Sequence, residues 1–263
     1  MSLTWPLPEN DYWSTPFAEV LLHLLDLFPG AAVLDVATGS GLPAFYLAEQ
    51  VGPEGRVLAI DINHRQVLHA RSVQGAHLPW LSFEVGDMRR LPPSLPRFDR
   101  ITGNLAFMFF RPDRHGALKN LTALLKPGGQ IVLTFPSLGT FASLWTRVEE
   151  EMEKRQLQKE RQALAEYIEE RPSADQSRRW LEGLGLEKVD VIEWPLEIAT
   201  GPGREFLNHP LLRGGFLDDV YECFADPARA GEFMTAIAED TASFTPLLAQ
   251  RCAMSAWMPK EKT

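Results

Sequence analysis

The stretch AAVLDVATGSG, residues 31–41, decides how this chain folds. A short apolar run, interrupted only by Asp35, breaks after Val36 into the turn Ala37-Thr38-Gly39-Ser40-Gly41, as a buried strand does where it ends. The residues after the turn have helical spacing with Pro43 at an early position, and the free N–H groups of a helix N-terminus favour a carboxylate or phosphate. The stretch therefore indicates a nucleotide site. The alternative is an ordinary glycine turn of an α/β protein.

Two further apolar runs lead to carboxylates. Residues 56–61 end at Asp61, which stands twenty positions after Gly41, and residues 81–85 are followed closely by Asp87. An acidic side chain at the position of Asp61 can accept hydrogen bonds from both hydroxyls of a ribose. Its alternative role is to cap the helix expected at residues 64–73. We expect Asp35, Asp61 and Asp87 to share one edge of a sheet.

Four motifs in this order, VLDVATGSG, LAIDI, VGDM and LLKPGGQIVLTFP, resemble the motif series of class I S-adenosylmethionine-dependent methyltransferases. The core is most similar to the quinone C-methyltransferases and to the malonyl carrier-protein O-methyltransferase. The resemblance covers roughly residues 12–135 well and a C-terminal part less well. It implies S-adenosylmethionine as the cofactor and methyl transfer as the reaction.

The same resemblance implies where the cofactor binds. Asp35 would help to hold the amino group, Asp61 the ribose and Asp87 the adenine amine. The cofactor-binding residues carried over in this way are Asp35, Ala37, Thr38, Gly39, Gly41, Asp61, Ile62, Asp87, Met88, Asn104, Leu105 and Ala106.

Strand and helix patterns alternate four times before Phe135, which predicts an α/β fold. The expected architecture is a doubly wound, seven-stranded, mostly parallel sheet of the Rossmann-like methyltransferase type, with helical lid insertions. Strands are expected at 31–36, 56–61, 81–85, 98–106 with its exit, 130–135 and 188–194, with an antiparallel seventh at 251–258. Helices are expected at 11–28, from 42 onward, at 64–73 and at 113–125.

The chain is expected to form a single methyltransferase domain over residues 1–263, with a cofactor-binding core at 11–136. Residues 137–172 show one apolar helix face followed by mixed charges, and residues 195–250 form a long, aromatic-rich insertion. A long insertion of this kind is usually functional or disordered, and its aromatic content argues against disorder. We expect the two insertions to form a substrate lid.

Composition narrows the class of partner. The formal net charge of −9 argues against an extended positively charged surface of the kind that binds nucleic acid. The two cysteines, Cys223 and Cys252, lack metal-ligand spacing, so no metal site is expected and a reduced, cytoplasmic protein fits. No apolar run reaches the roughly 18 residues that span a bilayer, so no membrane span is expected. The oligomeric state cannot be read from these residues.

The segment after the fourth strand bears on the methyl acceptor. It reads Gly103-Asn104-Leu105-Ala106, whereas amino-methylating families often read N-P-P-Y there. This departure argues against methylation of nucleic-acid bases or glutamine amines. The apolar run at residues 107–110, the aromatic-rich insertion at 195–250 and the net charge of −9 favour a small, largely apolar acceptor or acyl chain, with O- or C-methylation expected. Residues 107–110, FMFF, either line a hydrophobic pocket or belong to the core.

The sequence identifies no catalytic base. His209, Tyr12, His115 and Glu205 are candidates, and a capping or surface role is the alternative for His209. A nicotinamide adenine dinucleotide (NAD)-dependent oxidoreductase is a second hypothesis, because Gly39-x-Gly41-x-x-Ala44 with Asp61 also fits that fingerprint. It leaves Asp35 and Asp87 unexplained. A third is a catalytically inactive S-adenosylmethionine-binding regulatory protein.

Overall fold

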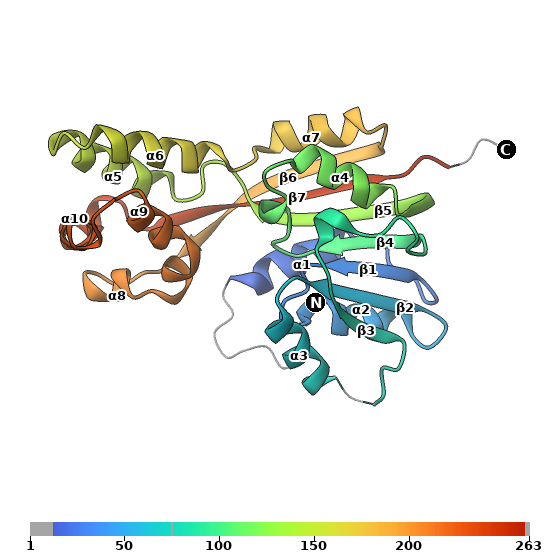
Figure 1. The fold of residues 1–263 in the computed structure, drawn as a ribbon. Helices are drawn as coiled ribbons and strands as arrows, with labels where there is room; N and C mark the ends of the chain where they lie inside the picture. The colour runs from blue at the N-terminus through green and yellow to red at the C-terminus, as the bar shows by residue number, and fades with distance from the viewer. Residues whose placement is uncertain (1–12, 75, 261–263) are drawn as a thin grey trace. The chain divides into compact units, whose positions relative to one another are not determined.

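A seven-stranded sheet organises the protein, as seen in a computed structural model that describes residues 13–74 and 76–260 (Figure 1). The strand order is β3-β2-β1-β4-β5-β7-β6. The strands are β1 (Ala32–Val36), β2 (Arg56–Asp61), β3 (Leu81–Val85), β4 (Phe98–Gly103), β5 (Leu125–Pro136), β6 (Glu187–Ile198) and β7 (Leu247–Trp257). This order is that of the doubly wound fold expected from the sequence.

Strands β1 to β5 pair in parallel, so their carboxyl ends meet at one edge. Strand β7 runs antiparallel to β5. The Gly128 N–H donates to the Met258 carbonyl, whereas the Ser137 N–H, directly after the end of β5, donates to the earlier Gln250 carbonyl. The mostly parallel sheet with an antiparallel seventh strand is therefore confirmed.

Helices cover both faces of the parallel part of the sheet. The α-helices are α1 (Ser14–Leu24), α2 (Leu42–Val51), α3 (His64–Val73), α4 (Arg114–Thr122), α5 (Ala142–Lys154), α6 (Gln158–Glu169), α7 (Ala174–Gly183), α8 (Arg204–Leu207), α9 (Leu217–Glu222) and α10 (Pro227–Glu239). Four short turns of other helical types are η1 (Met88–Arg90), η2 (Phe107–Phe109), η3 (Leu212–Phe216) and η4 (Thr241–Ser243).

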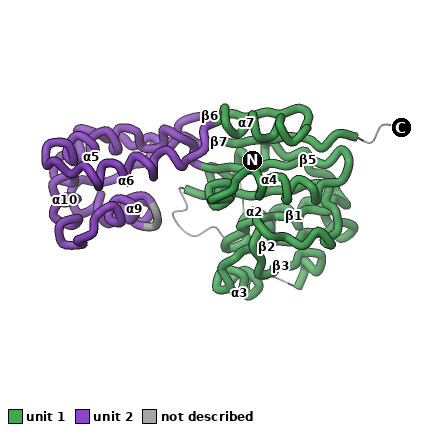
Figure 2. Tube along the Cα trace, turned by 45° about the horizontal axis from the view of Figure 1, so that its top comes forward, with its two compact units in different colours: residues 1–135, 174–192, 252–263 green, residues 136–173, 193–251 purple. Residues whose placement is uncertain are grey.

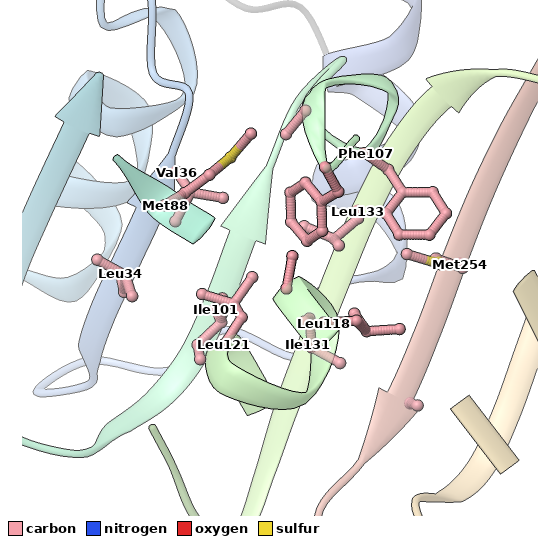
Figure 3. Close-up of a cluster of buried hydrophobic side chains, with 14 of the residues drawn as sticks. Leu34, Val36, Met88, Ile101, Phe107, Leu118, Leu121, Ile131, Leu133 and Met254 are labelled. Atoms are coloured by element: carbon pink, nitrogen blue, oxygen red, sulfur yellow. The ribbon is translucent and has the colours of Figure 1, made fainter. Parts of the chain in front are cut away.

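Alternate residues of β1 enter two different cores. Leu34 and Val36 join a cluster with residues of β4, β5, α4 and α7, part of which Figure 3 shows. Val33 joins a second cluster with residues of α1, α2 and α3. A parallel sheet buried on both faces requires such continuous apolar strands, and β1 is buried at every position. The buried strand ends are therefore held rigidly.

The chain divides into two compact units, coloured separately in Figure 2. Unit 1 comprises residues 1–135, 174–192 and 252–263, and contains β1 to β4, most of β5, and α1 to α4 and α7. Unit 2 comprises residues 136–173 and 193–251, and contains α5, α6 and α8 to α10. The unit boundaries fall close to the expected insertions at 137–172 and 195–250, whose role as a lid stays a prediction.

Several boundaries differ from those expected. Helix α1 ends at Leu24, because the side chain of Gln130 holds the next turn by accepting from the Asp26 N–H and donating to the Leu24 carbonyl. Strand β5 already begins at Leu125 rather than at residue 130, and its pairing with β4 shifts register between residues 125 and 130. Strands β6 and β7 are longer than expected and contribute residues to both units.

Candidate functional site

The turn after β1 has an unusual backbone that glycine makes possible. Ala37, Gly39 and Gly41 have φ of 53°, 55° and 90°. A Cβ on Gly41 would lie 2.8 Å from the ring of Phe45 and 2.9 Å from that of Phe83, so a side chain cannot fit there. At Gly39 a Cβ would meet nothing within 4 Å. The turn is therefore packed against the core at Gly41 and open at Gly39.

Asp35 lies beneath this turn and is fully buried. Its Oδ1 accepts a 2.8 Å hydrogen bond from the hydroxyl of Thr102, its register partner on β4. Its Oδ2 and the buried Oγ1 of Thr38 have no hydrogen-bond partner among the described residues. A buried carboxylate oxygen without a partner is costly, and a ligand ammonium group would satisfy it.

Burial raises the pKa of Asp35 to about 6, against the opposing effect of the neighbouring hydroxyls of Thr38 and Thr102. The charge of Asp61 raises it further. Asp61 thus lies near Asp35, as expected for carboxylates at the ends of adjacent parallel strands.

Asp61 anchors the glycine turn to the end of β2. Its Oδ2 accepts from the Gly39 N–H and its Oδ1 from the Asn63 N–H, both at 2.8 Å. The N-cap of α3 is Asn63, whose side chain accepts from the Arg65 N–H, so the capping alternative for Asp61 is wrong. A carboxylate has about four acceptor positions, which leaves capacity for two ribose hydroxyls. Ile62 beside it is 65% exposed.

Asp87 follows β3 and is held by Arg89. Its Oδ2 accepts from Nη2 of Arg89 at 2.8 Å, and its Oδ1 accepts from the Arg89 backbone N–H and Nε, both at 2.9 Å. These bonds lower the pKa of Asp87. Met88 is buried in the core. The three predicted carboxylates thus lie at the ends of three neighbouring strands, while the contact of Asp87 with adenine stays a prediction.

The segment after β4 is fixed by Thr134 of β5. The Thr134 hydroxyl donates to Oδ1 of Asn104 at 2.8 Å and accepts from the Leu105 N–H at 2.9 Å. The Ala106 N–H donates to the Thr134 carbonyl. Leu105 has a φ of 54°, a strained value for a branched side chain that these bonds stabilise. This segment therefore has a defined shape at the same edge of the sheet.

Residues 107–110 differ in burial. Phe107 and Phe110 are buried, and their rings pack at a centroid distance of 5.2 Å. Phe109 is 55% exposed. The buried pair belongs to the core, and Phe109 can contact a ligand.

The catalytic candidates do not gather in one unit. His115 is exposed on α4 in unit 1, whereas Glu205 and His209 belong to unit 2. Burial lowers the pKa of His209, opposed by a hydrogen bond with the backbone of Ala199. Tyr12 lies outside the described residues. Within residues 13–74 and 76–260, no three His, Cys, Asp or Glu side chains are grouped so that they could hold a metal ion.

Three supporting residues were not expected from the sequence: Thr102, Thr134 and Arg89. The position of Thr102 could have been found, because parallel pairing of the first and fourth strands sets it opposite Asp35. Arg89 follows Asp87 by two residues, a spacing that permits the ion pair without requiring it. Thr134 gives no local signal, since its contact joins residues thirty positions apart.

Residues 33–129 match the family model described as a methyltransferase domain. Relatives include a tRNA (guanine(6)-N2)-methyltransferase from Thermus thermophilus, 36% identical over 124 residues, and a nocamycin O-methyltransferase from Saccharothrix syringae, 38% identical over 125 residues. These matches cover 44% and 46% of this chain but 37% and 43% of the relatives, so the chain spans less than half of their length. A solved S-adenosylmethionine-dependent methyltransferase from Aquifex aeolicus shares the fold, with a TM-score of 0.52 and 18% identity over 92% of this chain and 89% of that one.

Proposed function

The chain carries a class I S-adenosylmethionine-dependent methyltransferase domain, and from this premise we propose that it methylates a small, largely apolar acceptor at oxygen or carbon. The observation that carries the site assignment is the buried carboxylate of Asp35, whose Oδ2 lacks a partner beneath the open turn at Gly39. A cationic amino group supplies the charge that this oxygen lacks.

The residues present fit the cofactor. Asp35 would accept from its amino group, and Thr38 with Gly39 would surround its methionine portion. Asp61 would accept from the ribose hydroxyls, while its existing bond to the Gly39 N–H keeps the turn in place. When bound, S-adenosylmethionine supplies an electrophilic methyl group on a sulfonium, so the hard chemistry belongs to the cofactor.

The protein's contribution is then to position the acceptor and exclude water. Correct placement of two reactants can account for about 7 to 11 kcal/mol of a reaction barrier. The segment from Asn104 to Ala106, fixed by Thr134, provides a rigid wall for this purpose. The helical insertions at 137–172 and 195–250 would supply the remaining acceptor contacts as a lid.

Three features support an apolar acceptor. Phe109 exposes its ring directly after the rigid segment at the end of β4. The net charge of −9 disfavours the phosphate backbone of nucleic acid. The segment after β4 lacks the N-P-P-Y pattern of amino-methylating families. The similarity to a nocamycin O-methyltransferase agrees with this class of acceptor.

Transfer of label from methyl-labelled S-adenosylmethionine tests the proposal. The protein is incubated with a small-molecule metabolite extract and, separately, with bulk tRNA and with DNA. We expect label chiefly in the organic-extractable fraction, and loss of that transfer in Asp61→Ala. The tRNA arm is a stringent comparison, because one relative is a tRNA methyltransferase. Label chiefly in nucleic acid would refute the acceptor class, and no transfer to any acceptor would favour a regulatory protein.

A further inference from the structure

Four arginines gather beside the candidate cofactor site, and none of them is assigned a contact with the cofactor above. This arginine cluster consists of Arg89 and Arg90 in η1, and Arg111 and Arg114 at the beginning of α4. Nη1 of Arg89 donates to the Arg111 carbonyl at 3.1 Å, which joins the two segments. The cluster is notable in a chain whose net charge is −9. In the chain, its two segments come after the carboxyl ends of β3 and β4. They therefore lie at the edge of the sheet that carries Asp61 and the glycine turn.

Arg114 is the unusual member of the cluster. It is half-buried, and its Nε is buried without a hydrogen-bond partner among the described residues. Burial and the charge of nearby Arg111 lower its pKa to about 10. Buried charges in proteins are normally paired, because removing an ion from water is costly. Arg114 therefore lacks the counter-charge that its position calls for.

The neighbouring carboxylates are engaged elsewhere. Asp87 is held by Arg89 through both oxygens, and Asp113 accepts from the Gly116 N–H as the N-cap of α4. Neither forms an ion pair with Arg114 within the part of the chain that the structure describes. An anionic group of a ligand would supply the negative charge that the described residues do not place beside Arg114.

An exposed apolar side chain lies close to the cluster in the sequence. Phe109, whose ring is 55% exposed, precedes Arg111 by two residues and belongs to η2. A ligand could place an apolar body on this ring and an anionic group near Arg114. Arginine suits such a group, because its planar guanidinium donates two parallel hydrogen bonds to a carboxylate or phosphate.

We propose that Arg111 and Arg114 form a binding subsite for an oxyanion, a carboxylate or phosphate, carried by the apolar methyl acceptor. The subsite would orient an amphiphilic acceptor with its charged end at the arginine cluster and its body along Phe109. This inference rests on the proposed methyl transfer, and it narrows the acceptor to acidic amphiphiles.

The test uses three ligands with the same eight-carbon body. Octanoate, monooctyl phosphate and neutral octanamide are titrated calorimetrically into the protein saturated with S-adenosylhomocysteine. We expect at least one anion to bind the wild type more tightly than octanamide does. In Arg114→Gln that anion should lose affinity about tenfold or more, because a charge-assisted hydrogen bond is removed. The two anions distinguish a carboxylate from a phosphate end.

The matched control is Arg65→Gln, which removes the same charge from an exposed position on α3. It should bind the anion as the wild type does, and a melting curve of each variant confirms folding.

Equal binding of the anions and octanamide, no binding of either anion, or an unchanged anion affinity in Arg114→Gln would overturn the proposal. S-adenosylhomocysteine titrated into the ligand-free wild type and variants tests the cofactor assignment separately. Loss of its binding alone would refute that assignment while leaving the oxyanion subsite.

Discussion

The ionisation of Asp35 is expected to affect protein stability and cofactor binding in opposite directions. Its pKa rises from 3.8 to about 6 chiefly through burial, so the folded protein holds the proton more tightly than the unfolded chain does. The stability that this provides is fully present below pH 3.8 and is lost as the pH rises through about 6. Above that pH the cofactor-free protein bears the full cost of a buried charge, which a bound ammonium group would offset.

Replacing Asp35 by asparagine should therefore stabilise the cofactor-free protein and weaken cofactor binding. At pH 8 we expect a gain in the free energy of unfolding of up to about 3 kcal/mol, since each pKa unit corresponds to roughly 1.4 kcal/mol. At pH 4.5 the gain should fall to about 1 kcal/mol, because Asp35 is then largely protonated in the folded protein. Urea unfolding at both pH values measures the difference, with Asp190→Asn as the exposed control. An equal gain at both pH values would contradict the ionisation account.

Asp61 offers a second residue-level test, because its neighbour Asn63 is the true N-cap of α3. Asp61→Ala should lower the affinity for S-adenosylmethionine by roughly 10- to 150-fold, through lost hydrogen bonds to a charged group. Asn63→Ala should instead cost about 0.5 to 2 kcal/mol of stability with nearly unchanged affinity. Calorimetry and thermal melting of both variants separate the two roles. Wild-type affinity in Asp61→Ala would show that this carboxylate is not the ribose ligand.

At the scale of elements, the sequence predicts the boundaries of a strand or helix best where turn or capping residues flank an apolar run that is buried. Strands β2 and β3 and helix α3 have the boundaries expected, because apolar runs there are bounded by glycine, proline or a capping residue. The end of α1 and the start of β5 differ, because Gln130 and the register shift act between residues distant in the sequence. The same limit explains why Thr134 was not foreseen.

Gln130 gives a prediction at this scale. It is buried and joins three elements, accepting from the Asp26 N–H and donating to the Leu24 carbonyl and the Ser255 hydroxyl, each at 2.9 Å. Gln130→Ala leaves two backbone groups without partners and should cost about 2 to 4 kcal/mol in the free energy of unfolding. The exposed Gln66→Ala on α3 should change it by less than about 0.5 kcal/mol. Similar losses in both variants would refute the role of Gln130.

At the scale of the whole molecule, the sequence marks the two insertions but not how they combine. Segments 136–173 and 193–251 form one compact unit although 19 residues of unit 1 separate them. This unit includes the half-buried Arg171, whose guanidinium lies 4.3 to 5.6 Å from the ring centroids of Tyr167, Phe216 and Trp145. Periodicity within each segment predicts helices but cannot predict which side chains meet across them.

Among the described residues, no helix is both long enough and apolar enough to cross a membrane.

The choice between S-adenosylmethionine and a dinucleotide tests the central claim most directly. The Gly39 N–H, which a pyrophosphate would need, already donates to Asp61, and the carboxylate of Asp61 at the turn would repel the negative charge of a pyrophosphate. S-adenosylmethionine, S-adenosylhomocysteine and NAD are therefore titrated calorimetrically into the wild-type protein under one set of conditions. We predict that the first two bind with one site per chain and that NAD does not. Binding of NAD without binding of S-adenosylmethionine would contradict the assignment.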